Sequence, residues 1–292
     1  MSPISSPLVT TTAPRETSGL VKFARRLKRE PGLLCGLAVM MLLLVVVVAP
    51  GLFTAQSPYT INIDDALQPP SAAHLFGTDD TGRDVFARVI YGARVTLLIC
   101  AGSLLIAALI GGLVGALSGF FGGWLDQILG RIVDVVLSFP PIILGVIITG
   151  VLGPATSNLI LALSIIHIPM FFRIARSGAL GEAGKTYVEA ARCVGLNEIT
   201  VLYRHVLRNV LPLVLVQYMV LFPLVLQIQA ALGFLGLGVQ PPTPDWGAIL
   251  QQGKDTILLA PWISLFPGIA VLITAFALML TGRALQRSSD RR

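Results

Sequence analysis

The chain has 292 residues, of which 54% are apolar and only 12% charged, and its formal net charge is +6. A soluble domain carries roughly 25% charged residues, so this composition excludes an ordinary water-soluble protein and indicates one that lies in a membrane. The charges fall in clusters between five long windows that contain none: residues 31–63, 95–125, 135–172, 209–244 and 256–282.

The lengths of these windows predict the number of membrane crossings. A helix needs about 20 apolar residues to cross a hydrocarbon core of about 30 Å. The third window is long enough for two crossings, and Gly153 and Pro154 supply a turn in its middle. We therefore expect an all-α, polytopic membrane protein with six transmembrane helices, over residues 33–50, 97–119, 135–151, 158–176, 210–232 and 263–282.

The first apolar segment follows a basic N-terminal region, an arrangement that also occurs in secretory signal peptides. The run from Leu33 to Ala49 is longer than the usual apolar region of a signal peptide, about 7–15 residues. A cut after Ala49 would also leave Pro50 at the first position of the product. We favour a retained first helix over a cleaved signal, with residues 1–30 as a cytosolic tail.

The distribution of basic residues predicts the orientation in the membrane. Lys and Arg near the ends of spans are retained on the cytoplasmic side. If the N-terminus is cytoplasmic, all but four of the 21 basic residues lie on that side; the four exceptions are Arg83, Arg88, Arg94 and Lys254. Both termini are therefore expected in the cytoplasm. Because these charges flank spans and form no continuous patch, they do not indicate nucleic-acid binding.

Polar residues inside the predicted spans bear on the energy source. None of these spans contains Asp, Glu, Lys or Arg well inside it, whereas ion-driven carriers use embedded carboxylates or ion sites at broken helices. Gln217, Gln227 and Gln229 lie on three different faces of the fifth span. His167 is interpreted as a packing histidine. The sequence thus disfavours coupling to an ion gradient within this chain.

No catalytic or metal-binding pattern is found. Cys35, Cys100 and Cys193 are too scattered for a disulfide framework or a metal site. Residues 179–186 satisfy a relaxed phosphate-loop pattern, but they follow a predicted membrane helix where a phosphate loop requires a buried strand. We expect no metal, no ATP site and no enzymatic activity in this chain.

Glycines in the second predicted span indicate close helix packing. Gly111, Gly115 and Gly119 form two overlapping repeats of small residues at a spacing of four, which allow another helix to approach closely. Packing within one bundle and contact with a second subunit explain these repeats equally well.

The largest loop predicted on the cytoplasmic side, residues 177–209, has the pattern of two short helices. Thr186 to Cys193 is rich in helix formers, Gly195 supplies a turn, and Asn197 is a helix N-cap. Ala190 and Ala191 keep one side of the first helix small, so that another protein can approach its backbone. The alternative is an amphipathic loop that lies on the bilayer.

The sequence Glu189, Ala190, Ala191, three further residues and Gly195 resembles the EAA loop of ABC-importer permeases. This resemblance implies that the loop is a coupling helix that docks onto an ATPase subunit. Its expected contact residues are Tyr187, Glu189, Ala190, Ala191, Gly195 and Leu196. One departure is Arg208, at a position where the family often has proline.

A second segment, residues 74–97, is similar to the C-type permeases of dipeptide, oligopeptide and nickel importers, as are residues 234–250. The matching residues include Gly77, Thr78, Asp79, Gly82, Arg83, Asp84 and Arg88. Their charges predict ion pairs at the start of the second span, with tight turns at the glycines. We interpret this segment, and Asp245 with Trp246, as ordering the outer mouth rather than contacting solute.

The resemblance implies the fold and partners of a type I ABC-importer permease in the plasma (inner) membrane. The first helix and extracytoplasmic loop would be residues 31–94, the permease core 95–282, and a cytosolic tail 283–292. Expected partners are a homologous second permease subunit, one or two ABC ATPase subunits that carry ATP and Mg, and an extracytoplasmic solute-binding protein. The expected solute is a di- or oligopeptide; the alternatives are nickel, glutathione or haem, an ion-coupled carrier, or a membrane scaffold.

Overall fold

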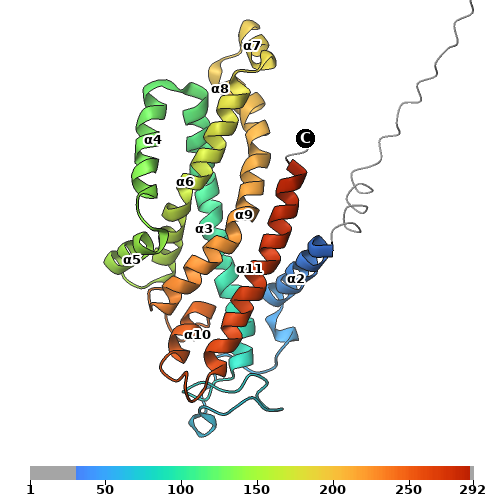
Figure 1. Ribbon diagram of the computed structural model, residues 1–292, viewed down its shortest axis with the longest axis vertical. Helices are drawn as coiled ribbons and strands as arrows, with labels where there is room; N and C mark the ends of the chain where they lie inside the picture. Colours follow the sequence, from blue (N-terminus) through green and yellow to red (C-terminus); the bar gives the residue numbers. More distant parts are fainter. Residues whose placement is uncertain (1–30, 290–292) are drawn as a thin grey trace, which may run out of the picture.

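The computed structural model describes residues 31–289. The predicted cytosolic tail, residues 1–30, lies outside this part, as do the last three residues of the predicted C-terminal tail. Within the described part the regular secondary structure is helical, which confirms the all-α prediction. The long helices run side by side along the vertical axis of Figure 1.

The first two long helices differ in how well the sequence predicted them. Helix α2 (Pro31–Val48) matches the first predicted span, and it is followed by the short turns η1 (Pro50–Leu52) and η2 (Ile63–Asp65). Helix α3 (Val85–Phe121) begins well before the predicted residue 97. The reason is its cap, because the Asp84 carboxylate accepts a hydrogen bond from the Ala87 amide at 2.7 Å and starts the helix there.

The predicted continuous helix at 135–151 is wrong, and a span there is not confirmed. This part of the chain belongs to two helices, α4 (Gly123–Leu137) and α5 (Pro141–Leu152), which are bent by 90° at their junction. Pro140 disfavours a helical conformation in the residue before it, and Pro141 occupies the first turn of α5, where its missing N–H costs nothing. The two prolines therefore end one helix and start the next.

The second half of the chain contains the remaining helices. They are α6 (Thr156–Ala183), α7 (Thr186–Cys193), α8 (Glu198–Val201), a π-helical turn η3 (Leu202–Val206), α9 (Leu207–Phe234), α10 (Trp246–Gly253) and α11 (Trp262–Ser289). Figure 1 places α7 at one end of the molecule, and α10 with the segment between α2 and α3 at the opposite end.

Six separate spans are not confirmed. Four described helices are long and apolar enough to cross a membrane: α3, α6, the continuous segment Glu198–Phe234, and α11 as far as Ala284. The bent pair α4 and α5 raises this number to five if it counts as one span. The apolar part of α2, Leu34–Val48, is shorter.

The tightest packing in the bundle is between α3 and α6. A Cβ atom on Gly115 would lie 2.3 Å from the carbonyl oxygen of Phe172, and one on Gly119 would lie 2.2 Å from that of Arg176. Larger residues cannot be placed at these positions without moving the helices apart. The glycine repeat of α3 therefore serves packing within this chain.

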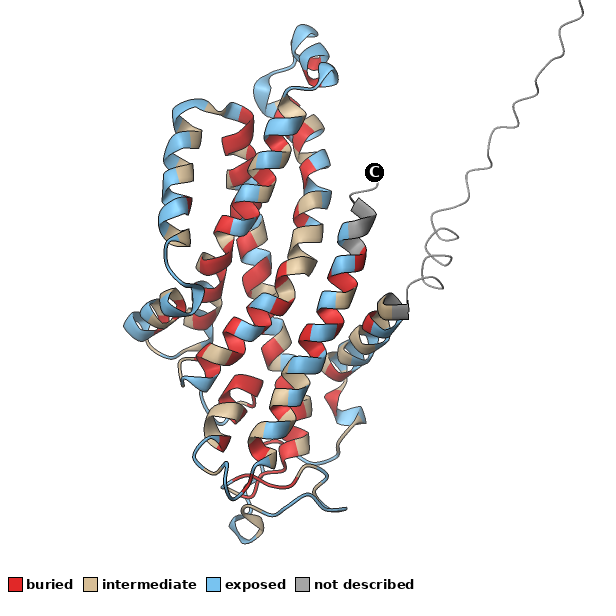
Figure 2. Ribbon diagram, in the orientation of Figure 1, coloured by how far each residue is buried: buried red, intermediate tan, exposed pale blue. Residues whose placement is uncertain are grey.

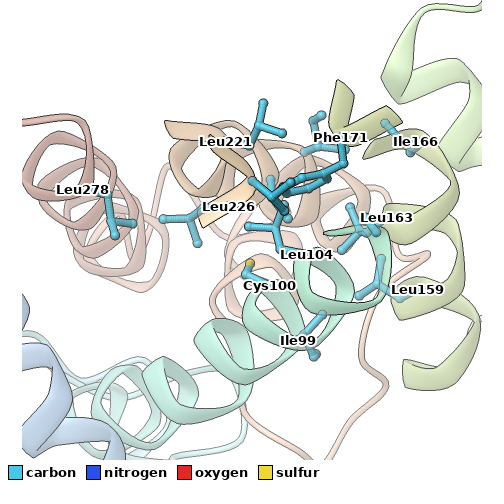
Figure 3. Packing of buried hydrophobic residues seen from close by; sticks show 14 of the residues in the cluster. Ile99, Cys100, Leu104, Leu159, Leu163, Ile166, Phe171, Leu221, Leu226 and Leu278 are labelled. Carbon is cyan, nitrogen blue, oxygen red and sulfur yellow. The ribbon is translucent and has the colours of Figure 1, made fainter. Parts of the chain in front are cut away.

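Apolar side chains from four helices form the core. Figure 3 shows Leu104 of α3, Phe171 of α6 and Leu226 of α9 pointing toward one another, with Leu278 of α11 beside them. The outward faces of the same helices are exposed and also apolar, with Leu109 63% exposed (Figure 2). A helix that is apolar on its outer face as well as its inner face is typical of a membrane span.

Candidate functional site

Two sets of residues predicted from the sequence lie at opposite ends of the bundle. We name residues 184–197, which connect α6 to α8, the α7 loop. We name Asp79, Arg83 and Arg88 the Asp79 cluster. The α7 loop projects beyond the ends of the long helices at the top of Figure 1, and α3 begins at the Asp79 cluster near the bottom.

Helix α7 has one buried face and one open face. Val188 is fully buried and Ala191 nearly so, and they face the rest of the protein. Tyr187, Glu189 and Ala190 are exposed. The residues predicted to contact another protein are thus divided: Glu189 and Ala190 are open to a partner, whereas Ala191 fixes α7 to its own chain.

The turn after α7 requires a glycine. Gly195 has φ of +88°, a left-handed conformation that side chains disfavour. The amides of Gly195 and Leu196 donate to the carbonyls of Arg192 and Ala191 at 2.9 and 3.2 Å, which closes the end of the helix. Asn197 then caps α8 by accepting a hydrogen bond from the Thr200 amide at 2.7 Å, as the sequence predicted.

Arg192 connects α7 to two neighbouring helices. Its Nε lies 3.0 Å from Oε1 of Glu198 in α8, and its Nη2 lies 3.1 Å from Oε2. The same guanidinium lies 5.4 Å from the centre of the Phe120 ring, at the end of α3, in a cation–π contact. A displacement of α7 would therefore act on α3 and α8 through this side chain.

Glu182, in the last turn of α6, accepts hydrogen bonds from two side chains of the α7 loop and from one of α9. They come from Lys185 Nζ at 2.5 Å, from the Tyr187 hydroxyl, and from Asn209 Nδ2 of α9 at 3.2 Å. Asn209 also donates to the Tyr187 hydroxyl at 2.8 Å and to the His205 carbonyl at 3.0 Å. Burial and the neighbouring carboxylate raise the pKa of Tyr187, which stays a neutral donor.

This network gives Tyr187 a structural role that the sequence did not predict. Neither Glu182 nor Asn209 was among the predicted site residues. The spacing of Glu182 and Lys185 by three residues was a usable signal for an ion pair. No local pattern indicated Asn209, because its partners are 22 and 27 residues away.

Exposed apolar side chains continue the open face of the α7 loop. Val194 is 83% exposed, Ile199 73% and Tyr203 77%, and Leu196 is also exposed. Apolar side chains that project into water beyond the membrane helices are typical of a protein-binding surface. Val194 and Leu196 of the α7 loop, with Ile199 and Tyr203 beyond it, therefore add exposed apolar side chains to a region that also carries the exposed carboxylates of Glu189 and Glu198.

The Asp79 cluster confirms the predicted ion pairs for Asp79, Arg83 and Arg88, but not for Asp84. The Asp79 carboxylate is fully buried and accepts hydrogen bonds from Arg83 Nε at 2.8 Å and from Arg88 Nη1. Arg88 Nη1 also donates to Oε1 of Gln252 in α10 at 2.7 Å. Burial raises the pKa of Asp79, but the Arg88 charge and the hydrogen bonds from Thr81 and Arg83 outweigh it and hold that pKa below its ordinary value.

Asp84 and the two glycines have separate roles at this end. Asp84 lies outside the arginine pairs: it caps α3 and lies 3.0 Å from Nδ1 of His74. Gly77 and Gly82 have φ of +73° and +75°, and a Cβ on Gly82 would overlap the Asn62 carbonyl oxygen, which would lie 1.7 Å away. The Thr78 carbonyl accepts a hydrogen bond from Trp262 Nε1 of α11 at 3.0 Å.

Asp245 fixes α10 to the long helices. Its Oδ1 accepts hydrogen bonds from Thr96 Oγ1 of α3 at 2.6 Å and Gln229 Nε2 of α9 at 2.8 Å, and its Oδ2 accepts from the Ala248 amide at 3.1 Å. Burial raises the pKa of Asp245, although these hydrogen bonds oppose the shift. Trp246 is 2% exposed and donates to the Val89 carbonyl at 2.8 Å, so it is a core residue and not an anchor at the membrane surface.

Comparison with known proteins gives the family. Residues 111–292 match the family described as binding-protein-dependent transport system inner membrane component. The dipeptide transport system permease protein DppC of Alkalihalophilus pseudofirmus is 35% identical over 266 residues, which cover 91% of this chain and 88% of the relative.

Glutathione transport system permease proteins are similar over the same extent. GsiD of Pectobacterium atrosepticum is 34% identical over 270 residues, covering 92% of this chain and 90% of the relative. GsiD of Escherichia coli is 36% identical over 270 residues, covering 92% and 89%. The chain belongs to the family of binding-protein-dependent transport system inner membrane components, and its role is that of a permease subunit.

Proposed function

We propose that this chain forms half of the translocation pathway of an ATP-driven importer for short peptides, together with a homologous second permease subunit. The relatives named for dipeptide and for glutathione, itself a tripeptide, support this class of solute. The observation that carries the coupling role is the α7 loop, whose inner face is fixed to the bundle while Glu189 and Ala190 are open.

The proposed orientation places the α7 loop and both termini in the cytoplasm. Arg173 and Arg176 in the second half of α6, and Arg204 and Arg208 after the α7 loop, would then lie toward the side where basic residues are retained. The Asp79 cluster and α10 would face the opposite side. We further propose that α2 crosses the membrane and that the bent pair α4 and α5 together forms one more span, so that six spans result. With 18 residues at 1.5 Å each, α2 is about 27 Å long.

Coupling would pass from the α7 loop into the membrane helices. ATP hydrolysis on a partner ATPase subunit would move the docked α7 loop. That movement would act on α6 through Glu182, on α3 through the contact of Arg192 with Phe120, and on α9 through Asn209. Solute would arrive from an extracytoplasmic binding protein at the opposite end, where the buried contacts of Asp79 and Asp245 keep that end of the permease rigid.

Stimulated ATPase activity of the reconstituted complex tests this function. Glu189→Ala removes the open carboxylate, and Gly195→Ala strains the turn that orients α7. Gly184→Ala is a matched control in the same loop, since Gly184 has φ of −89° and no atom within 4 Å of an added Cβ.

We expect binding protein plus peptide to raise ATP turnover in the wild type and in Gly184→Ala, and to lose most of this effect in the other two variants. Equal stimulation of ATP turnover in all four proteins would contradict the docking role of the α7 loop. Uptake that follows a proton or sodium gradient without any ATPase subunit would show that the protein is an ion-coupled carrier and not an ATP-driven importer.

A further inference from the structure

A groove follows α3 and α9 along the bundle, and at the end away from the α7 loop it is also lined by α2 and α11. It consists of three connected hollows with volumes of about 360, 500 and 510 Å³. The first and second share Tyr218 and Met219, and the second and third share Leu109 and Leu211. On α3 the groove extends from Leu98 to Leu113, which at 1.5 Å per residue is about 22 Å.

The lining of the groove is suited to a hydrocarbon chain. Side chains of Leu109, Leu113, Leu211 and Leu215 are all more than half exposed although they are apolar. They lie on helices long and apolar enough to span a membrane, so their exposed surface faces lipid or a membrane partner. Gly112 also lines the groove, where it adds no side chain.

The end of the groove beside the α7 loop is basic. Arg204 and Arg208 line it, together with Tyr203. Neither arginine takes part in the ion pairs found among residues 31–289. Two like charges four residues apart on one helix repel each other, so this end of the groove favours an anion.

The backbone at this end has an uncommon geometry. The π-helical turn η3 (Leu202–Val206) lies between α8 and α9, and the Leu207 amide donates to the Leu202 carbonyl. A π turn is wider than an α turn and shifts the side chains that follow it around the helix axis. The π turn therefore determines the directions in which the side chains of Tyr203, Arg204 and Arg208 project.

We propose that this groove binds an anionic phospholipid from the leaflet on the α7 side, with an acyl chain along Leu109 and Leu211 and the phosphate between Arg204 and Arg208. The two ends of such a lipid match the two parts of the groove, one apolar and one doubly basic. The site goes beyond the proposed function, which it uses only to name this leaflet the cytoplasmic one. The bound lipid contacts η3, which together with α8 joins the α7 loop to α9.

The test is native mass spectrometry of the full-length chain, taken from bilayer discs of phosphatidylcholine that contain phosphatidylglycerol. We expect the wild type to retain phosphatidylglycerol in preference to phosphatidylcholine. The double variant Arg204→Gln/Arg208→Gln should lower this preference about 30-fold at low ionic strength, since each basic residue near an anionic headgroup accounts for about a fivefold change.

A second pair of variants tests the apolar part without changing charge. Leu109→Trp fills the groove from an exposed position and should also lower phosphatidylglycerol retention. Ile110→Trp is its control, because Ile110 is an exposed neighbour on α3 outside the groove. Arg283→Gln controls for the loss of a positive charge elsewhere, at an exposed position on α11.

Three results would overturn the proposal. The first is unchanged phosphatidylglycerol preference in the double variant. The second is an equal loss in Arg283→Gln, which would reflect general surface charge. The third is loss of the second permease subunit from the complex of Leu109→Trp with lipid retention unchanged, which would make the groove a protein interface. Lipid retention is measured without a transport assay. Its result therefore tests the lipid site independently of the importer function.

Discussion

The Arg192 guanidinium in α7 binds both carboxylate oxygens of Glu198 in α8, at 3.0 and 3.1 Å. The pair closes across the Gly195 turn, so it fixes the angle between the two short helices of the loop. Both side chains are well exposed, and the stability that such a pair contributes is at most about 1 kcal/mol. Its value to the protein therefore lies in the orientation of α7.

Breaking this pair should affect coupling more than stability. We expect Arg192→Gln to lower the stimulated ATPase rate of the complex several-fold while the unfolding temperature changes little. The charge exchange Arg192→Glu/Glu198→Arg should recover part of the rate. Arg173→Gln is the control, because Arg173 and Asp134 form an exposed pair of similar length, 2.9 Å, away from α7. A fall of the same size in Arg173→Gln would contradict the orienting role.

The glycine contact between α3 and α6 should be intolerant of a single methyl group. Gly115→Ala places a Cβ 2.3 Å from the Phe172 carbonyl oxygen, and overpacking of this kind costs about 1–3 kcal/mol. Gly102 lies on the same helix, and no atom lies within 4 Å of a Cβ added there. Gly102→Ala should therefore keep or raise the stability of the protein. Thermal unfolding of the two variants in detergent compares them directly, and equal unfolding temperatures would show that the helices separate easily.

The buried charge of Asp79 predicts a dependence of stability on pH. Folding lowers the pKa of Asp79 below its ordinary value of 3.8. The Asp79 carboxylate therefore contributes fully to the free energy of unfolding above about pH 3.8. This contribution is lost as the pH falls through the lower pKa of the folded state. Asp79→Asn should cost about 3–5 kcal/mol at neutral pH, since it leaves Arg83 and Arg88 buried without their carboxylate. The difference from wild type should shrink below pH 4.

Asp80→Asn is the matched control for this measurement. Asp80 is 52% exposed and lies 3.9 Å from Arg83, so its loss should change the unfolding temperature little at any pH. A difference between Asp79→Asn and wild type that stays constant down to pH 2 would show that the charge of Asp79 is not what stabilises the cluster.

Asp245→Asn should loosen α10. The amide group of asparagine would direct N–H groups at one of the donors that now bind the carboxylate, Thr96, Gln229 or the Ala248 amide. An unsatisfied buried donor costs about 1–3 kcal/mol. We expect a lower unfolding temperature and faster hydrogen exchange in residues 245–253, whereas Asp255→Asn, at an exposed position beyond α10, should leave both unchanged. Unchanged exchange in Asp245→Asn would contradict the fixing role of Asp245.

The sequence predicted elements where the determining signal is local. Asn197 and Gly195 were recognisable as a cap and a turn because each acts within a few residues. The early start of α3 had an equally local signal in Asp84, but the prediction followed apolar content and began the helix where the charges end. A helix that begins outside the membrane with charged residues is not detected by hydropathy.

The errors and omissions have two causes. Either the contact that determines the structure joins residues distant in the sequence, or the apolar composition of a segment misleads. The break between α4 and α5 was hidden because residues 135–151 are uncharged and mostly apolar, although Pro140 and Pro141 signalled it. The partners of Asp245, Thr96 and Gln229, come from other helices. Only the folded chain brings these side chains together.

The native Cys193 offers the most direct test of where the α7 loop lies and what covers it. Cys193 is exposed at the end of α7, whereas Cys100 is buried, and Cys35→Ser removes the remaining exposed thiol. We expect a membrane-impermeant maleimide to label Cys193 only from the cytoplasmic face of oriented vesicles, and at least tenfold more slowly when the ATPase subunits are bound. Labelling from the opposite face, or a rate that is the same with and without these subunits, would contradict a cytoplasmic coupling loop.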